Sequence, residues 1–65
     1  MDQYKLVGSH VSLVGLAALI QTRWGWDSPC MVEIGKNQWE VQLKGKAIEG
    51  VRVIKKGNRF RFEMK

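Results

Sequence analysis

The chain has 65 residues, including 11 Lys or Arg and 6 Asp or Glu, and a formal net charge of +5 at pH 7. A chain this short forms one small domain, residues 1–65, that buries only about 60% of the surface its unfolded form exposes. Its single cysteine and single histidine exclude an internal disulfide framework and a four-ligand zinc site. We therefore expect no cofactor and a reducing, cytoplasmic setting.

The positive charge is concentrated in the second half of the chain. Residues 36–65 contain nine Lys or Arg against three Glu, a net charge of +6, whereas residues 1–35 contain two Lys or Arg against three Asp or Glu, a net charge of −1. A small basic region of this kind is typical of proteins that bind nucleic acids. The alternative interpretation is that these charges only keep the protein soluble.

The first segment predicts neither a signal peptide nor a membrane span. Residues 1–7 could form a short strand or an arm. Residues 11–20 are an apolar run behind Lys5, but no small-residue cleavage site follows them. A run of ten residues is also shorter than the roughly 20 that a helix needs to cross a bilayer. We therefore expect no membrane partner.

Residues 9–24 have the spacing of one helix. Ser9 is a suitable N-cap, with Ser12 as the alternative, because a serine hydroxyl can accept a hydrogen bond from a free amide of the first turn. Gly25 can adopt the left-handed conformation that ends a helix. The stripe predicted to face the core consists of Leu13, Leu16, Ala17, Ile20 and Trp24.

This predicted helix is more apolar than one sheet can cover. Further apolar residues extend around it, and a helix that is apolar on most sides is buried on most sides. We therefore predict a homodimer in which a second helix approaches a groove of small residues. The residues predicted at this interface are Ser12, Gly15, Leu19 and Thr22. Alternatively, the first and last segments of the same chain cover the helix.

Residues 30–44 alternate between apolar and polar, which predicts a β-hairpin. With residues 36–37 as a two-residue turn, Val32 lies opposite Val41 on the apolar face. Asn at the second turn position suits this geometry because asparagine tolerates a positive φ. Residues 44–46 then form the next turn.

Residues 47–64 predict a second hairpin that begins with an irregularity. Ile48 and Val51 are out of phase for a single strand, and Gly50 lies between them. We therefore expect a β-bulge, or a break between two strands, at residues 49–50.

The second hairpin carries most of the predicted binding site. With residues 56–57 at its turn, Arg52 lies opposite Arg61 on the face away from the apolar residues. Like charges directly opposite each other destabilise a β-ribbon, so this pair is most simply explained by an anionic partner. The predicted nucleic-acid-binding residues are Lys44, Lys46, Arg52, Lys55, Lys56, Arg59 and Arg61. Alternatively, these charges only protect a sheet edge from aggregation.

The other side chains with functional potential are assigned to the core or to the solvated surface. Aromatic residues can stack on unpaired bases, but the phase of Trp39, Phe60 and Phe62 favours core positions. The acidic residues are scattered, and the sequence has no Gly-rich phosphate loop. We therefore predict that the protein is not an enzyme and binds no metal.

Together these patterns predict an α+β fold, with one N-terminal helix packed on an antiparallel meander of about four strands. The alternative is a small closed barrel of the SH3-like or Sm-like kind with an N-terminal helix. We expect a non-catalytic nucleic-acid-binding protein with a regulatory or accessory role. Duplex DNA is favoured over RNA because a two-stranded ribbon fits the major groove. The alternative function is a protein-interaction module, a small inhibitor or adaptor, that docks on an acidic protein through its apolar helix or a sheet edge.

Overall fold

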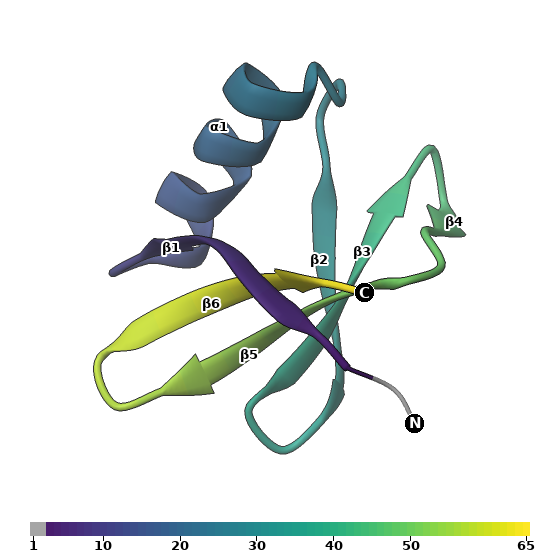
Figure 1. Cartoon of the computed structure of the whole chain (residues 1–65). Coiled ribbons are helices and arrows are strands. Elements are labelled where there is room, and N and C mark those ends of the chain that lie inside the picture. Colours follow the sequence, from purple (N-terminus) through teal and green to yellow (C-terminus); the bar gives the residue numbers. More distant parts are fainter. Residues whose placement is uncertain (1–2) are drawn as a thin grey trace.

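The computed structural model describes residues 3–65 and contains one α-helix and a six-stranded antiparallel sheet (Figure 1). The α+β class is as predicted, but the sheet has six strands rather than about four. The additional strands are residues 5–10, before the helix, and the two-residue strand 46–47, which follows the turn at residues 44–45. The elements in chain order are β1 (Lys5–His10), α1 (Leu13–Trp24), β2 (Cys30–Gly35), β3 (Gln38–Leu43), β4 (Lys46–Ala47), β5 (Val51–Lys56) and β6 (Arg59–Met64).

The sheet has the order β1-β6-β5-β3-β2, and β4 pairs with β3 beside β5. In Figure 1 the β2–β3 hairpin crosses β5 and β6 at a steep angle, and α1 lies on the inner side of this bend. The helix contacts β1, β6 and β2. Among residues 3–65, no pairing joins the edge strands β1 and β2 to each other. The sheet therefore remains open where the alternative barrel would close.

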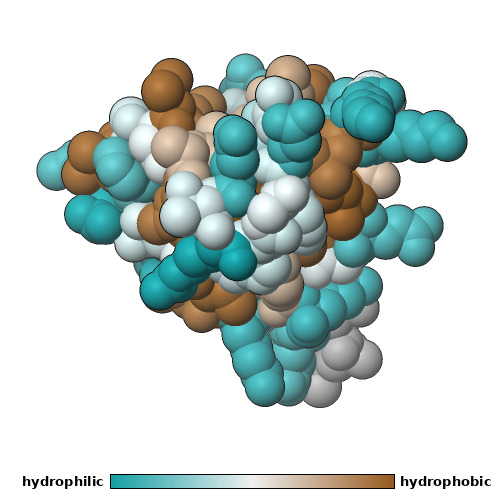
Figure 2. All heavy atoms as spheres, turned by 90° about the horizontal axis from the view of Figure 1, so that it is seen from above, coloured by the Kyte–Doolittle hydropathy of each residue, from teal (hydrophilic) through white to brown (hydrophobic). Residues whose placement is uncertain are grey.

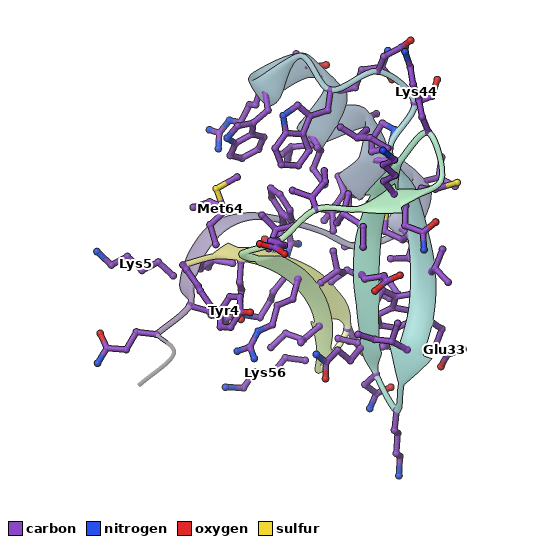
Figure 3. All side chains as sticks on the ribbon, turned by 90° about the vertical axis from the view of Figure 1, so that its right-hand side faces the viewer. Tyr4, Lys5, Glu33, Lys44, Lys56 and Met64 are labelled. Atoms are coloured by element: carbon purple, nitrogen blue, oxygen red, sulfur yellow. The ribbon has the colours of Figure 1, made fainter. Side chains whose placement is uncertain are left out.

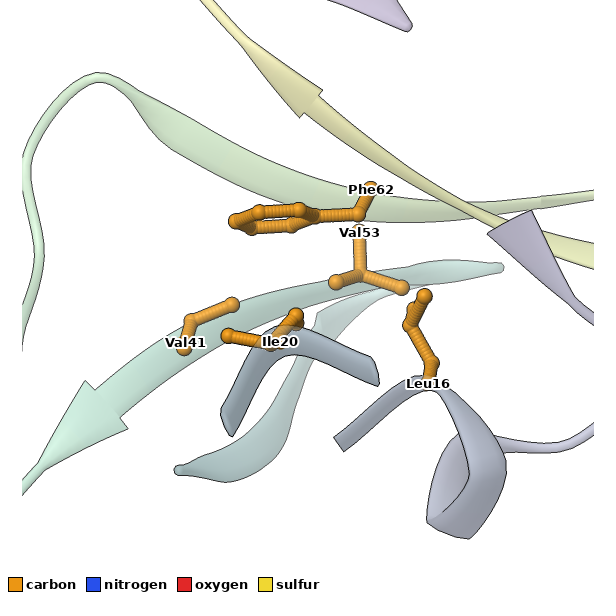
Figure 4. Packing of buried hydrophobic residues seen from close by; sticks show 5 residues of the cluster. All are labelled: Leu16, Ile20, Val41, Val53 and Phe62. Atoms are coloured by element: carbon orange, nitrogen blue, oxygen red, sulfur yellow. The ribbon is translucent and has the colours of Figure 1, made fainter. Parts of the chain in front are cut away.

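The core lies between α1 and the concave face of the sheet. Its fully buried side chains point toward one another from the two layers (Figure 4), and they are Leu16, Ile20, Val41, Val53 and Phe62. The helical spacing of the first two and the alternate positions of the others explain why each element has one buried face. The predicted apolar stripe of the helix therefore faces the core, with Leu16 and Ile20 at its centre.

The helix is shorter at its start than the predicted range 9–24. Ser9 and His10 belong to β1, and the alternative cap, Ser12, precedes the first turn and accepts a hydrogen bond from the Gly15 amide at 3.0 Å. At the other end the prediction is confirmed, because Gly25 has a φ of 70° and its amide donates to the Gln21 carbonyl.

The first hairpin has the predicted turn at residues 36–37, but the predicted face of β2 was wrong. A register shift around Ile34 places Met31, and not Val32, opposite Val41. Because side chains alternate with a period of two, a shift of one residue moves Val32 to the outer face. Val32 is accordingly 40% exposed and Ile34 is 54% exposed.

The second hairpin is also present, but its predicted register was wrong. Residues 57–58 form the turn, and Arg52 therefore lies opposite Glu63. Both registers leave the same apolar residues on one face, so the alternation does not distinguish them. The turn does, because Gly57 occupies the first central position with a φ of 62°. The predicted register would have placed Lys56 there, where hairpin turns require a positive φ.

The expected break at residues 49–50 is confirmed. β4 pairs with the end of β3 at Leu43, whereas β5 pairs with its start at Gln38 and also with β6. Gly50 has a φ of 81° between the two strands. The chain can therefore leave the end of β3 after β4 and pair with the start of β3 through β5.

Candidate nucleic-acid interface

The outer face of β5 and β6 carries an ion-pair network centred on a buried carboxylate. Glu63 has a side chain only 6% exposed and accepts from Arg52 Nε at 2.8 Å and from Arg61 Nε at 3.1 Å. The guanidinium of Arg52 also lies 4.0 Å from the centroid of the Tyr4 ring. The predicted pairing of Arg52 with Arg61 across the hairpin was therefore wrong, and both side chains instead bind the Glu63 carboxylate. The two arginines need no external anion to explain their positions.

A second group of cations lies at the tips of the two hairpins. The backbone amide of Lys55 donates to the Asn37 carbonyl at 2.9 Å, which holds the β5–β6 tip against the β2–β3 turn. Exposed basic residues lie in or next to both turns. We define the cationic end as Lys36, Lys55, Lys56 and Arg59, all of which are exposed.

Most of these cations are available to a partner. Both ion pairs formed within residues 3–65 involve Glu63, so the three lysines of the cationic end pair with no carboxylate there. Arg59 donates from Nε to the Ser9 hydroxyl at 3.2 Å, a neutral partner that leaves its charge uncompensated. Lys55 Nζ lies 5.7 Å from the centroid of the Phe60 ring.

The remaining predicted binding residues, Lys44 and Lys46, are not part of this group. Lys44 lies in the turn at the far end of β3 and Lys46 begins β4, and Figure 3 shows Lys44 near the top of the molecule and Lys56 in its lower part. The six residues of β3 span about 20 Å of strand between the two ends. One compact ligand therefore cannot contact all the predicted residues at once.

Lys36 is the member of the cationic end that sequence reasoning missed. It was assigned only to the turn at residues 36–37 and was not included in the site. Its proximity to Lys55 depends on the pairing of β3 with β5, which brings the two tips together. The available signal was that consecutive hairpins of a meander place alternate turns at the same end of the sheet.

Two aromatic side chains adjoin the cationic end without being fully buried. Trp39 is the second residue of β3 and Phe60 the second residue of β6, and their ring centroids lie 5.3 Å apart at an angle of 71°. Both pack against the edge of the core, whereas Phe62 lies at its centre. At the other end of the core, Trp24 and Trp26 contact Phe62 edge-on.

The groove predicted for a second helix is occupied by β1. A Cβ at Gly15 would overlap the His10 imidazole, and a Cβ at Gly8 would lie 3.0 Å from Leu19 Cδ2. The helix still exposes apolar surface on another side, where Val14 is 82% exposed. Figure 2, which views the molecule from above Figure 1, shows several separate hydrophobic groups among hydrophilic side chains. The homodimer remains a prediction, and two of its four predicted residues, Gly15 and Leu19, pack against β1.

Residues 3–65 contain no group of three His, Cys, Asp or Glu side chains able to hold a metal ion. Nor do they form a pocket. No helix in this part of the chain is long and apolar enough to cross a membrane. Comparison with protein-family models, curated proteins and solved structures found no match to this chain.

Proposed function

We propose that this protein binds nucleic acid without catalysing a reaction, through phosphate contacts made by the cationic end. The observation that carries the proposal is the convergence of Lys36, Lys55, Lys56 and Arg59 on two adjacent hairpin tips, with no carboxylate partner for the three lysines among residues 3–65. Like charges held together in this way repel one another, and an anionic polymer relieves that repulsion. A regulatory or accessory role in the cytoplasm suits a small binder with one free cysteine, Cys30.

The contacts available at the tips favour affinity over sequence recognition. Lysine ammonium groups on flexible stems act as point charges toward phosphates, and phosphate contacts carry no sequence information. Neutralising each phosphate releases counterions, so log affinity falls with log salt by about 0.7–0.9 per contact. Four contacts therefore correspond to a slope of about −3.

The predicted insertion of the β5–β6 ribbon into the major groove of DNA has little support in this fold. The groove accepts a two-stranded ribbon, but β1 flanks β6 as far as Phe60, and β3 flanks β5 at Val53 and Ile54. Only the tip, residues 56–59, extends beyond these neighbours, because the Lys55 amide still donates to the Asn37 carbonyl. Contact through the tip with the sugar-phosphate backbone is the mode that this geometry favours.

The test is fluorescence anisotropy of labelled oligonucleotides titrated with protein at several salt concentrations. The variant Lys36→Gln/Lys56→Gln removes two charges from the cationic end. We expect its affinity to fall about tenfold at low salt and its salt slope to become shallower by about 1.5.

The matched control is Lys44→Gln/Lys46→Gln, which removes the same charge from exposed positions at the far end of β3. We expect this control to keep the parent slope. Equal losses in both variants would indicate a general effect of net charge. Absence of binding by the parent protein at low salt would show that the cationic end is only a solvated surface.

The exposed edge of β2 favours one alternative function, a protein-interaction module. β2 is the last strand of the sheet, and Val32 and Ile34 are exposed on it. A partner strand could pair with this edge and cover both side chains. A stoichiometric protein partner that resists nuclease treatment, and that is lost in Ile34→Lys, would favour this function over nucleic-acid binding.

A further inference from the structure

The aromatic pair Trp39–Phe60 shares one face of the sheet with Lys55, a member of the cationic end, whereas Lys56 and Arg59 lie on the opposite face of the tip. Lys55 pairs with Phe60, and Val53 pairs with both Phe62 and Trp39. Paired residues share a face of the sheet, so Lys55 and the two rings all lie on its concave side. The distance of 5.7 Å between Lys55 Nζ and the Phe60 centroid places a cation beside the Phe60 ring.

The two rings are accessible enough to take part in recognition. Trp39 and Phe60 are half-buried and lie outside the fully buried core. Their near-perpendicular contact, at 71°, presents the edge of one ring to the face of the other. Because neither residue is fully buried, part of this aromatic pair reaches solvent and is open to a further planar group.

A strand of unpaired nucleotides matches this combination of groups. Its bases present free π faces that stack on aromatic side chains, and its phosphates accept hydrogen bonds from lysine. In a duplex the base faces are already stacked on one another, so they are not available to an aromatic pair on the protein, and only base edges and phosphates remain accessible. The charge and the aromatic surface together therefore distinguish the two kinds of ligand.

One carboxylate opposes such a ligand. Glu33 lies opposite Trp39 on the neighbouring strand, is exposed, and shares the concave face with the rings. A phosphate beside Trp39 would be repelled by this charge, so Glu33 weakens the site and also offers a variant that should improve it.

From these observations we propose that the cationic end binds an unpaired polynucleotide strand, with at least one base stacked against Trp39 and Phe60. This inference rests on the proposed nucleic-acid binding and specifies its ligand. Lys55 contacts the phosphates next to the stacked base, the other members of the cationic end contact phosphates farther along the strand, and the aromatic pair supplies affinity that does not depend on salt. Single-stranded DNA and single-stranded RNA share this chemistry, and separate arms of the test distinguish them.

The experiment measures anisotropy with labelled oligo-dT, oligo-U and a DNA duplex of equal length. We expect the parent protein to bind one or both single strands at least fivefold more tightly than the duplex. Trp39→Leu and Phe60→Leu should each weaken single-strand binding about tenfold while leaving the salt slope unchanged. Glu33→Gln should strengthen it.

The matched control is Trp26→Leu, which changes a half-buried indole at the opposite end of the core. Thermal unfolding confirms that each variant is folded at the assay temperature. If Trp39→Leu does not fold, the variant Trp24→Phe/Trp26→Phe retains Trp39 as its single tryptophan, since the chain has three. Oligo-dT or oligo-U should then quench its fluorescence, and the duplex should not.

The outcomes separate this inference from the function on which it rests. Equal affinity for single strands and duplex, with no loss in Trp39→Leu and no quenching, would overturn base stacking. The salt slope and its reduction in Lys36→Gln/Lys56→Gln would still support phosphate binding in that case. Absence of binding to all three oligonucleotides would overturn both proposals.

Discussion

Glu63 is the residue whose position most changes the interpretation of the charged surface. It lies beneath two guanidinium groups whose side chains are 34% and 32% exposed. Hydrogen bonds to charged groups contribute more to stability than neutral ones, and each oxygen of this carboxylate serves one arginine. Arg52 and Arg61 therefore have a structural role in holding β5 to β6.

This arrangement predicts the effect of neutralising the carboxylate. Glu63→Gln should lower the free energy of unfolding by about 2 kcal/mol, because the amide has one acceptor oxygen and leaves the two guanidinium charges to repel each other. The loss is below that of a fully buried pair because water reaches both arginines. Urea unfolding followed by tryptophan fluorescence measures it.

The control is Glu49→Gln, an exposed glutamate outside the network. Its free energy of unfolding should stay within about 0.5 kcal/mol of the parent value. A similar loss in both variants would show that Glu63 acts only through the net charge.

At the scale of single elements, α1 is shaped by its contact with β1. The helix lacks a side chain at Gly15, and the His10 imidazole occupies the space where a Cβ would lie. The Ser12 amide also donates to His10 Nδ1 at 3.2 Å. His10 therefore fixes the angle at which the chain passes from β1 into the helix.

A double-mutant cycle tests this packing. Alanine is a better helix former than glycine by about 1 kcal/mol, so Gly15→Ala would stabilise an isolated helix. In this protein we expect Gly15→Ala to destabilise, because the new methyl group displaces the His10 ring. In the His10→Ala background the same substitution should stabilise. The coupling free energy from chemical denaturation should exceed about 1 kcal/mol. Additive effects would contradict the packing of β1 on this side of the helix.

The hairpins show how much of the fold the sequence could predict. Alternation identified both hairpins, and turn residues identified the break at residues 49–50. Alternation cannot identify the register, because a two-residue shift of one strand against the other keeps the same side chains on the same face. In the β5–β6 hairpin the positive φ of Gly57 determines the register. In β2 a bulge at Ile34 moves Val32 from the predicted inner face to the outer face. Bulges depend on which side chains the core can accept, and this information is not local.

At the scale of the whole molecule, the candidate site is formed by a pairing that the local patterns do not contain. Lys55, Lys56 and Arg59 could be predicted from one hairpin, and the structure keeps them together. Lys36 joins them only because β3 pairs with β5, and Lys44 and Lys46 separate from them for the same reason. Composition motivates the proposed class of ligand, and topology decides which basic residues lie together.

The pairing of β1 with β6 has a consequence for the order of folding. It joins Lys5 to Met64, nearly the full length of the chain, whereas the hairpins and the helix close short loops. Contacts distant in sequence carry the larger loop-closure cost, so they raise the contact order and tend to form late.

We therefore expect β1 to dock after the folding transition state. Val7→Ala, in β1 beside the core, should speed unfolding about tenfold and leave the folding rate unchanged. Val53→Ala, in the β5–β6 hairpin, should slow folding instead. Stopped-flow chevron plots measure both rates, and equal slowing of folding by the two variants would contradict this order. A chain that folds in this way passes through partly folded states in which one edge of β6 is unpaired. Its kinetic resistance to proteolysis therefore depends on how strongly β1 pairs with β6.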